Sequence, residues 1–294
     1  MRRSALTLIE TLVVLGIISV LVGLTLSGVQ RVRSSASRAN CQNRLRQVGI
    51  GLANYHTAHG KLPPGVTAKG DPQAFELMGW QARILPYIEQ DAVWRQATEA
   101  IKTQPYDFTA TPPHPFATVI PTFCCPADDR VRTPQPSRMK PQVALGSYLG
   151  VTGTRSARLD GILFYGSSVR MTDIADGASN TLLVGERPPS PDFWVGWWYA
   201  GYGVDFRGTA DTVLGVRERR SVSDPSFPDC GSGSAHFKEG RFDSMCDVMH
   251  FWSPHSGGAN FAFADGSVRF LNYSADSIMP ALATRAGGEA VDLP

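Results

Sequence analysis

Length, composition and charge limit the classes of protein before any motif is considered. The chain has 294 residues, 43% of them hydrophobic, and a formal net charge of +2. A charge this close to zero, without a run of basic residues, gives no indication of nucleic-acid binding. The 29 glycines and 21 prolines lie mainly beyond residue 60. They indicate turns, short strands and long loops there rather than a helical bundle.

The first element in the chain is an apolar segment. Between Leu6 and Val29 every residue except Glu10 is apolar, Gly, Ser or Thr. A helix of this length crosses the roughly 30 Å of hydrocarbon in a bilayer. A signal peptide would have a shorter apolar stretch, about 7–15 residues, before a small-residue cleavage site. We therefore predict a transmembrane helix over residues 6–29, in which Glu10 is costly unless a partner charge neutralises it.

The sequence RRSALTLIE, residues 2–10, resembles the cleavage and methylation motif of type IV prepilins and type II secretion pseudopilins. In that family a prepilin peptidase removes the leader and the new N-terminal residue is methylated. The resemblance implies a leader over residues 1–5, cleavage between Ala5 and Leu6, and methylation of Leu6. Glu10 becomes the fifth mature residue, which in the family pairs with the N-terminal amine of a neighbouring subunit. The family usually has Gly and Phe where this chain has Ala5 and Leu6.

The flanking charges and the motif indicate opposite orientations. Arg2 and Arg3 precede the apolar segment, whereas five arginines follow it, at positions 31, 33, 38, 44 and 46. The positive-inside rule alone would place the C-terminal domain in the cytoplasm. The resemblance implies a single-pass anchor in the inner (cytoplasmic) membrane with the domain outside the cytoplasm. We adopt the orientation that the motif implies.

The helix is expected to continue beyond the membrane. Four residues recur at spacings of three and four and form an apolar stripe, with Cys41 upstream of it: Leu45, Val48, Leu52 and Tyr55. Gly60 and the prolines at 63 and 64 end the helix. We expect residues 30–59 to be the extramembrane half of a spine helix that packs on a globular domain over residues 60–294.

The rest of the chain has the composition of strands and loops. Residues 79–97 predict a short helical pair broken at Pro86, and residues 146–154, 180–187 and 193–206 predict strands. Within residues 260–271, a two-residue turn at Asp265-Gly266 predicts a hairpin in which Phe263 faces Val268 and Phe261 faces Phe270. The predicted fold class is α+β, with a long N-terminal helix and a mostly antiparallel, loop-rich domain. Pilins share this architecture.

Several blocks beyond the anchor resemble a large bacterial family of prepilin-like proteins that has no assigned activity. In chain order they are CQNRLRQVGIGLANYH, CCPADD, SYLGVTGT, MTDIADGASNTLLVGER and HSGGANFAFADGSVRFL. That family ends in a signature of His, nine residues and Asp-Gly, called H-X9-DG. Here it runs from His255 to Asp265 and Gly266. The resemblance implies an architecture and leaves the biochemistry open.

His255 and Asp265 have side chains suited to catalysis. A His and a carboxylate act together as a general base and its orienting group, but a hydrolase also needs a nucleophile or a metal. The chain has no Gly-x-Ser-x-Gly motif. We expect instead that Asp265-Gly266 forms the hairpin turn and that His255 hydrogen-bonds a nearby loop. The protein is therefore not expected to be an enzyme.

Two groups of residues have metal-ligand chemistry. The first is chemically suited to zinc: Cys230, His236, Cys246, His250 and His255. Only the last two of these have a spacing typical of a zinc motif. The second offers oxygen ligands for calcium without a complete acidic loop: Asp173, Asp176 and Asn180. We expect turn residues and caps there, and predict no metal and no cofactor.

Five cysteines leave at least one thiol unpaired. Outside the cytoplasm thiols are commonly oxidised, which favours a disulfide between Cys230 and Cys246. Cys124 and Cys125 are adjacent and their side chains diverge, so a bond between them would be strained. A bridge from Cys41 to either of them would tie the spine helix to the domain. The remaining thiol is expected to be buried.

A run of aromatic residues has two interpretations. Its members are Phe193, Trp194, Trp197, Trp198, Tyr199 and Tyr202. Exposed, such rings bind sugars or peptides, whereas buried rings form a core. We expect a core.

Taken together, the sequence predicts a prepilin-processed, membrane-anchored structural subunit of an extracytoplasmic filament or type II-like secretion assembly. Its expected partners are the prepilin peptidase and pilin-like subunits, its own or others, and its ligand is unknown. The alternative is a single-pass anchored module that binds envelope polysaccharide or a protein. An enzyme at His255 and Asp265 is a third, weaker hypothesis.

Overall fold

The computed structural model describes residues 8–68, 75–103, 115–137, 140–219 and 227–289. The chain divides into two compact units, Met1–Ala39 and Asn40–Pro294. Ala5 and Leu6, at the expected cleavage site, lie outside the described residues. The first helix, α1, runs unbroken from Leu8 to His59 and so belongs to both units. It ends where Gly60, at φ +72°, donates its N–H to the carbonyl of His56.

In the first unit, α1 exposes its apolar side chains. The large ones that are described between Leu8 and Val29 are 48–77% exposed. The hydroxyls of Ser19 and Thr25 donate to the carbonyls of Leu15 and Leu21, one turn earlier, at 2.7 and 2.9 Å. These polar groups are therefore satisfied within the helix, as hydrocarbon requires. The segment is long and apolar enough to cross a membrane.

The second unit is built on a five-stranded sheet with the order β5-β3-β4-β6-β7. Its strands are β3 (Tyr148–Gly153), β4 (Leu182–Glu186), β5 (Val213–Gly215), β6 (Gly258–Phe263) and β7 (Val268–Asn272). Only β3 and β5 pair in parallel, and every other pair in this sheet is antiparallel. A separate antiparallel pair comprises β1 (Gln135–Ser137) and β2 (Lys140–Val143). The predicted α+β class, with a long N-terminal helix and a mostly antiparallel domain, is confirmed.

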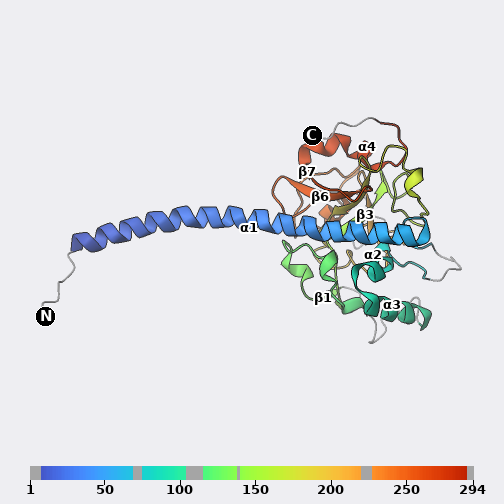
Figure 1. The fold of residues 1–294 in the computed structure, drawn as a ribbon, viewed down its shortest axis with the longest axis horizontal. Helices are drawn as coiled ribbons and strands as arrows, with labels where there is room; N and C mark the ends of the chain where they lie inside the picture. Colours follow the sequence, from blue (N-terminus) through green and yellow to red (C-terminus); the bar gives the residue numbers. More distant parts are fainter. Residues whose placement is uncertain (1–7, 69–74, 104–114, 138–139, 220–226, 290–294) are drawn as a thin grey trace. The chain divides into compact units, whose positions relative to one another are not determined.

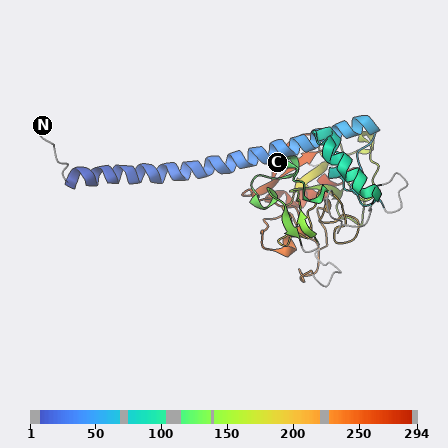
Figure 2. The same cartoon turned by 90° about the horizontal axis from the view of Figure 1, so that it is seen from below.

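The other helices of the second unit are short. The α-helices are α2 (Trp80–Arg83), α3 (Asp91–Thr103) and α4 (Met279–Ala283). The 3-10 turns are η1 (Leu85–Ile88), η2 (Pro115–Ala117), η3 (Pro121–Phe123), η4 (Asp129–Val131), η5 (Met171–Asp173), η6 (Met245–Met249) and η7 (Tyr273–Ile278). Figures 1 and 2 show the part of α1 beyond Asn40 lying along the sheet domain.

The core lies on both faces of the sheet. Successive residues of a strand point to opposite faces of the sheet. The apolar residues on the two faces form two separate clusters. Tyr148 belongs to one cluster and its neighbour Leu149 to the other. The first cluster includes the α1 stripe, namely Cys41, Leu45, Val48, Leu52 and Tyr55. The second includes Met279 and Leu282 of α4. The predicted packing of the spine helix on the domain is thus observed.

The β6–β7 hairpin differs from its predicted register by one residue. Ala262 pairs with Val268, and Phe261 pairs with Arg269. The backbone N–H of Phe263 donates to Ser267, so the loop has three residues rather than two. Gly266 ends it at φ +83°, the left-handed conformation that closes three-residue hairpin loops. Asp-Gly fits both loop lengths, which is why the predicted facing pairs were wrong.

Residues 193–206 form no strand, so that prediction was also wrong. The segment makes isolated bridges only, Trp197 with Leu145 and Ala200 with Met78. Gly196 and Gly203 turn the backbone at φ +111° and +58°, which interrupts any extended run. Three of the aromatic side chains are buried, Trp197, Trp198 and Tyr199, and the others are partly buried. The core interpretation of these rings therefore holds.

Candidate functional site

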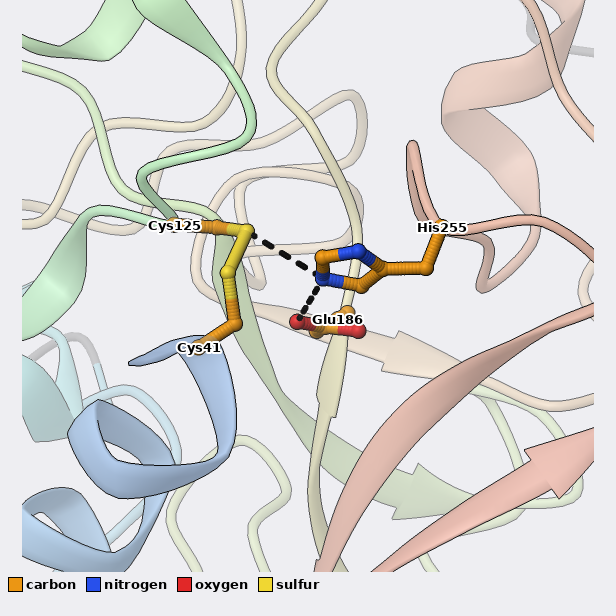
Figure 3. A group of neighbouring side chains, drawn as sticks. All are labelled: Cys41, Cys125, Glu186 and His255. Atoms are coloured by element: carbon orange, nitrogen blue, oxygen red, sulfur yellow. Dashed lines mark hydrogen bonds and ion pairs between the residues drawn. A yellow bond between two sulfur atoms is a disulfide. The ribbon is translucent and has the colours of Figure 1, made fainter. Parts of the chain in front are cut away.

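Four side chains with metal-ligand and acid–base chemistry meet inside the second unit. They are Cys41 of α1, Cys125 after η3, Glu186 at the end of β4 and His255 in the loop before β6. All four are less than 9% exposed. Figure 3 shows the His255 ring pointing between the sulfur of Cys125 and the carboxylate of Glu186. Nε2 of His255 lies 3.7 Å from Sγ of Cys125 and 3.5 Å from Oε1 of Glu186.

The two cysteines form a disulfide that joins α1 to the domain. Cys41 is placed by the apolar stripe of α1, of which it is the first buried member. The loop that carries Cys125 is fixed from both sides. The N–H of Cys125 donates to Oγ of Ser147 at 2.9 Å, and Arg44 of α1 donates to the carbonyl of Cys124 at 2.6 Å. Of the two candidate partners for Cys41, the structure therefore selects Cys125.

Glu186 was not singled out in the sequence. Its Oε2 accepts hydrogen bonds from the backbone and side-chain nitrogens of Asn260, at 2.7 and 3.0 Å. Its Oε1 accepts no hydrogen bond from the described residues and faces His255. The sequence feature that could have drawn attention to Glu186 is its position as an acid at the end of the apolar strand TLLVGE. An acid at the end of a strand is usually solvated, however, and only the sheet shows that this one is buried.

His255 and Asp265, the two ends of the H-X9-DG signature, do not meet in a catalytic pair. Asp265 is exposed in the hairpin loop, where its Oδ1 accepts from the N–H of Ser267 at 2.9 Å. His255 is instead held through its backbone N–H, which donates to Oγ of Ser253 at 3.1 Å. Asp265 therefore takes the turn role expected for it, with Glu186 as the carboxylate beside His255.

The hairpin loop also lies against the spine helix. A methyl group built at Gly49 of α1 would sit 3.8 Å from Gly266, an ordinary van der Waals distance. Gly49 follows Cys41 by eight residues, about 12 Å along a helix. The signature thus lies against α1 at two places along the helix. His255 lies beside the disulfide of Cys41, and Gly266 lies beside Gly49.

The family to which the chain belongs is shown by sequence comparison. Residues 30–277 match the model of a family described as a protein of unknown function, DUF1559. The chain is a member of the DUF1559 family. The matched region begins after the apolar segment and contains all five strands of the sheet and all four residues of the cluster. No curated protein and no solved structure matches the chain.

Within this DUF1559 domain, the five residues first considered for zinc do not form one metal-ligand group among the described residues. Cys230 and Cys246 form the second disulfide. His236 pairs with Asp276 at 2.8 Å, and His250 pairs with Asp247 at 2.9 Å. Of the five residues, only His255 belongs to the buried cluster with Cys41, Cys125 and Glu186 among the described residues.

The residues considered for calcium act as caps and turn residues. Asp173 pairs with Arg170 at 2.9 Å. The Asp176 carboxylate accepts hydrogen bonds from the N–H groups of Gly287 and Gly288, and the Asn180 side chain donates to the Asp176 carbonyl. Asp173 thus forms an ion pair three positions away, whereas the Asp176 carboxylate binds backbone N–H groups 111 and 112 positions along the chain.

Cys124 is the free cysteine, and it is buried as expected. Its Sγ lies 3.3 Å from the carbonyl oxygens of Ile120 and Val131, either of which can accept its single S–H. Burial raises the pKa of the Cys124 thiol to about 12. Because the thiolate is the reactive form, this side chain is inert at neutral pH.

A second buried charged group lies in the same domain, at Arg187 and Asp211. Arg187 donates to the carbonyls of Pro188 and Ala210. Oδ1 of Asp211 accepts from the N–H groups of Gly196 and Trp197, at 2.9 and 2.7 Å. Burial raises the pKa of Asp211 to about 7 and lowers the pKa of Arg187 to about 9. Asp211 thus holds the aromatic segment in place through the backbone of Gly196 and Trp197.

Proposed function

We propose that the protein is a prepilin-processed structural subunit, pseudopilin-like, of an extracytoplasmic filament or type II-like secretion assembly. The observation that carries the proposal is the N-terminal part of α1, which exposes apolar side chains and has an acid, Glu10, in its first turn. The motif RRSALTLIE supplies the cleavage and methylation site. The proposed location is the inner membrane, crossed once, with the DUF1559 domain outside the cytoplasm.

An acid at this position is explained by assembly. A carboxylate in hydrocarbon is tolerated when it has a partner charge. Cleavage before Leu6 would create a positively charged amine four residues before Glu10. In a bundle of such helices, the amine of one subunit and Glu10 of the next would neutralise each other. The free energy of this pairing would then favour assembly over the isolated helix.

The disulfides support the proposed orientation. Two bridges, Cys41–Cys125 and Cys230–Cys246, stabilise the domain. Disulfides of this kind form and persist mainly outside the reducing cytoplasm. They favour the orientation that the motif implies over the one implied by the arginines after the apolar segment.

Processing is tested by the mass of the mature protein. Chains recovered from their native membrane are expected to begin at N-methylated Leu6, because the peptidase would cut after Ala5. Intact-mass measurement and sequencing of the N-terminal peptide check this directly. A chain that begins at Met1, or one cut beyond Val22, would contradict prepilin processing and favour an anchored binding module.

The pairing role is tested by Glu10→Gln. The variant is expected to insert into the membrane normally and to be lost from any assembly, since the amide cannot neutralise the amine of a neighbour. Membrane fractionation and cross-linking of neighbouring subunits measure the two properties. Glu10→Asp, which keeps the charge, is the matched control and should retain most of the cross-linking. Equal cross-linking of Glu10→Gln and the parent chain would remove the pairing argument.

The binding-module alternative receives no specific support from the aromatic segment. Trp197, Trp198 and Tyr199 are buried, so these rings offer no flat surface for a sugar or a peptide. We also propose that the protein is not an enzyme, because His255 and Asp265 are engaged in separate contacts.

A further inference from the structure

We propose that Cys41, Cys125, Glu186 and His255 form a zinc site when the disulfide between the two cysteines is reduced. The four ligand atoms lie within 4.8 Å of one another, and the groups are those that zinc prefers: two sulfurs, an imidazole nitrogen and a carboxylate oxygen. Figure 3 shows them converging from separate segments of the chain. The inference concerns the domain core and is independent of the proposed assembly role.

The distances already fit a tetrahedral ion on two of its edges. Zinc bonds of about 2.0–2.3 Å place neighbouring ligand atoms roughly 3.4–3.8 Å apart. Nε2 of His255 lies 3.7 Å from Sγ of Cys125 and 3.5 Å from Oε1 of Glu186. The two sulfurs lie too close together because they are covalently bonded, and the remaining pairs of ligand atoms lie within 4.8 Å. Cleaving that bond lets the sulfurs move apart to the required separation.

Glu186 provides a second, independent indication of a cation. Its side chain is buried, yet Oε1 accepts no hydrogen bond from the described residues and faces the cluster. Asn260 occupies the other oxygen with two hydrogen bonds and so fixes the orientation of the carboxylate. Buried acceptors without a donor are rare in proteins and call for an explanation. The neighbour of Oε1 is Nε2 of His255, at 3.5 Å, and a metal ion bound to both atoms would give Oε1 a positive partner at bonding distance.

The positions of the ligands are fixed by neighbouring groups. The Tyr148 hydroxyl donates to the carbonyl of Cys41 at 3.2 Å, and Ser147 accepts from the N–H of Cys125. Oγ of Ser253 accepts from the N–H of His255 and itself donates to the carbonyl of Gly258. Such supporting hydrogen bonds orient the ligands of established metal sites.

The chemistry balances with a dithiol as reductant. The dithiol gives two electrons and two protons to the Cys41–Cys125 bond, which yields two thiols, and becomes a disulfide itself. Zn²⁺ then displaces both thiol protons and binds the two thiolates, neutral His255 and the Glu186 carboxylate. One ligand comes from α1 and three from the rest of the domain. The metal would therefore keep the spine helix attached under reducing conditions, where the covalent link is lost.

The test uses the full chain in detergent with Cys124, Cys230 and Cys246 replaced by Ser. Cys41 and Cys125 are then its only cysteines. The chain is reduced with dithiothreitol without oxygen and desalted, and Co²⁺ is added as a spectroscopic probe that zinc later displaces. We expect one tightly bound Co²⁺ per chain, with sulfur-to-cobalt charge-transfer absorption and the strong visible bands of tetrahedral cobalt. The oxidised chain should bind none at this site.

Single substitutions assign the other ligands. His255→Ala and Glu186→Gln are each expected to weaken zinc binding more than about tenfold, since even substitutions next to the ligands cost 10–100-fold. His250→Ala is the matched control, because His250 is also buried but pairs with Asp247 outside the cluster. Its zinc affinity should be unchanged. Formation of the Cys41–Cys125 disulfide before reduction shows that each variant folds.

Three results would overturn the proposal. The first is cobalt binding without sulfur charge transfer, and the second is equal zinc affinity in His255→Ala and the parent. The third is a reduced chain that loses its far-ultraviolet circular dichroism and does not recover it when zinc is added.

Discussion

Replacing Cys41 and Cys125 together by Ser is expected to lower the free energy of unfolding of the domain by about 4.5 kcal/mol. The bond joins residues 84 positions apart, so it removes much of the conformational freedom of the unfolded chain. Cys230 and Cys246 are only 16 positions apart, and the same loop-entropy relation gives about 3 kcal/mol for that bond. The two disulfides should therefore differ in their contribution to stability, with the one at α1 the larger.

Urea unfolding of the full chain in detergent, followed by tryptophan fluorescence, measures this difference. All six tryptophans lie beyond residue 60 and so report on the DUF1559 domain. Cys124→Ser is a matched control, because it changes an adjacent buried thiol and keeps both bridges. Its expected cost is about 1 kcal/mol. A smaller loss for the Cys41 and Cys125 double variant than for the Cys230 and Cys246 one would contradict the prediction.

Asp211→Asn is expected to gain stability relative to the parent chain as the pH rises. Burial raises the folded-state pKa of Asp211 to about 7, against 3.8 as its ordinary value. The folded state therefore binds a proton more tightly than the unfolded state. This contribution to stability is fully present below about pH 4 and is lost as the pH rises through 7. Between pH 5 and 8 the parent should lose roughly 2–3 kcal/mol relative to the variant.

The variant keeps the local contacts, because an amide oxygen still accepts from the N–H groups of Gly196 and Trp197. Urea titrations of both chains at several pH values give the difference directly. Asp243→Asn serves as the control, since Asp243 is exposed and its pairing with Arg241 lowers its pKa below the window. A parent-to-Asp211→Asn difference that stays constant from pH 5 to 8 would show that Asp211 is already ionised in the folded protein.

Much of the fold was predictable wherever a local pattern was strong. The apolar run and the stripe after it predict α1, and the β-branched content of residues 180–187 predicts β4. The hairpin register was not predictable, because Asp-Gly suits two loop lengths. The choice depends on the packing of β6 and β7 between the two cores. The segment at 193–206 has the composition of a strand, but its glycines turn the backbone and its rings enter the core.

The candidate site was predictable in its parts but not in its arrangement. Adjacent cysteines cannot be distinguished by sequence, so the choice of Cys125 over Cys124 depends on the fold. The partner of His255 was sought at the other end of its signature, in Asp265. The structure instead places Glu186 there, 69 positions earlier in the chain. The two residues are brought together by the pairing of strands that are far apart in the chain, which a local sequence pattern does not show.

The position of the disulfide at Cys41 also has a mechanical consequence. Cys41 is the first buried side chain of α1 among those described, and the apolar stripe follows it. A force that pulls on the membrane end of the helix would load this covalent bond before it reaches Leu45, Val48 or Leu52. The disulfide would then stop α1 from detaching from the domain residue by residue, because it is the first attachment under load. If this bond were reduced without zinc present, only the non-covalent packing of the apolar stripe would hold the helix against such a force.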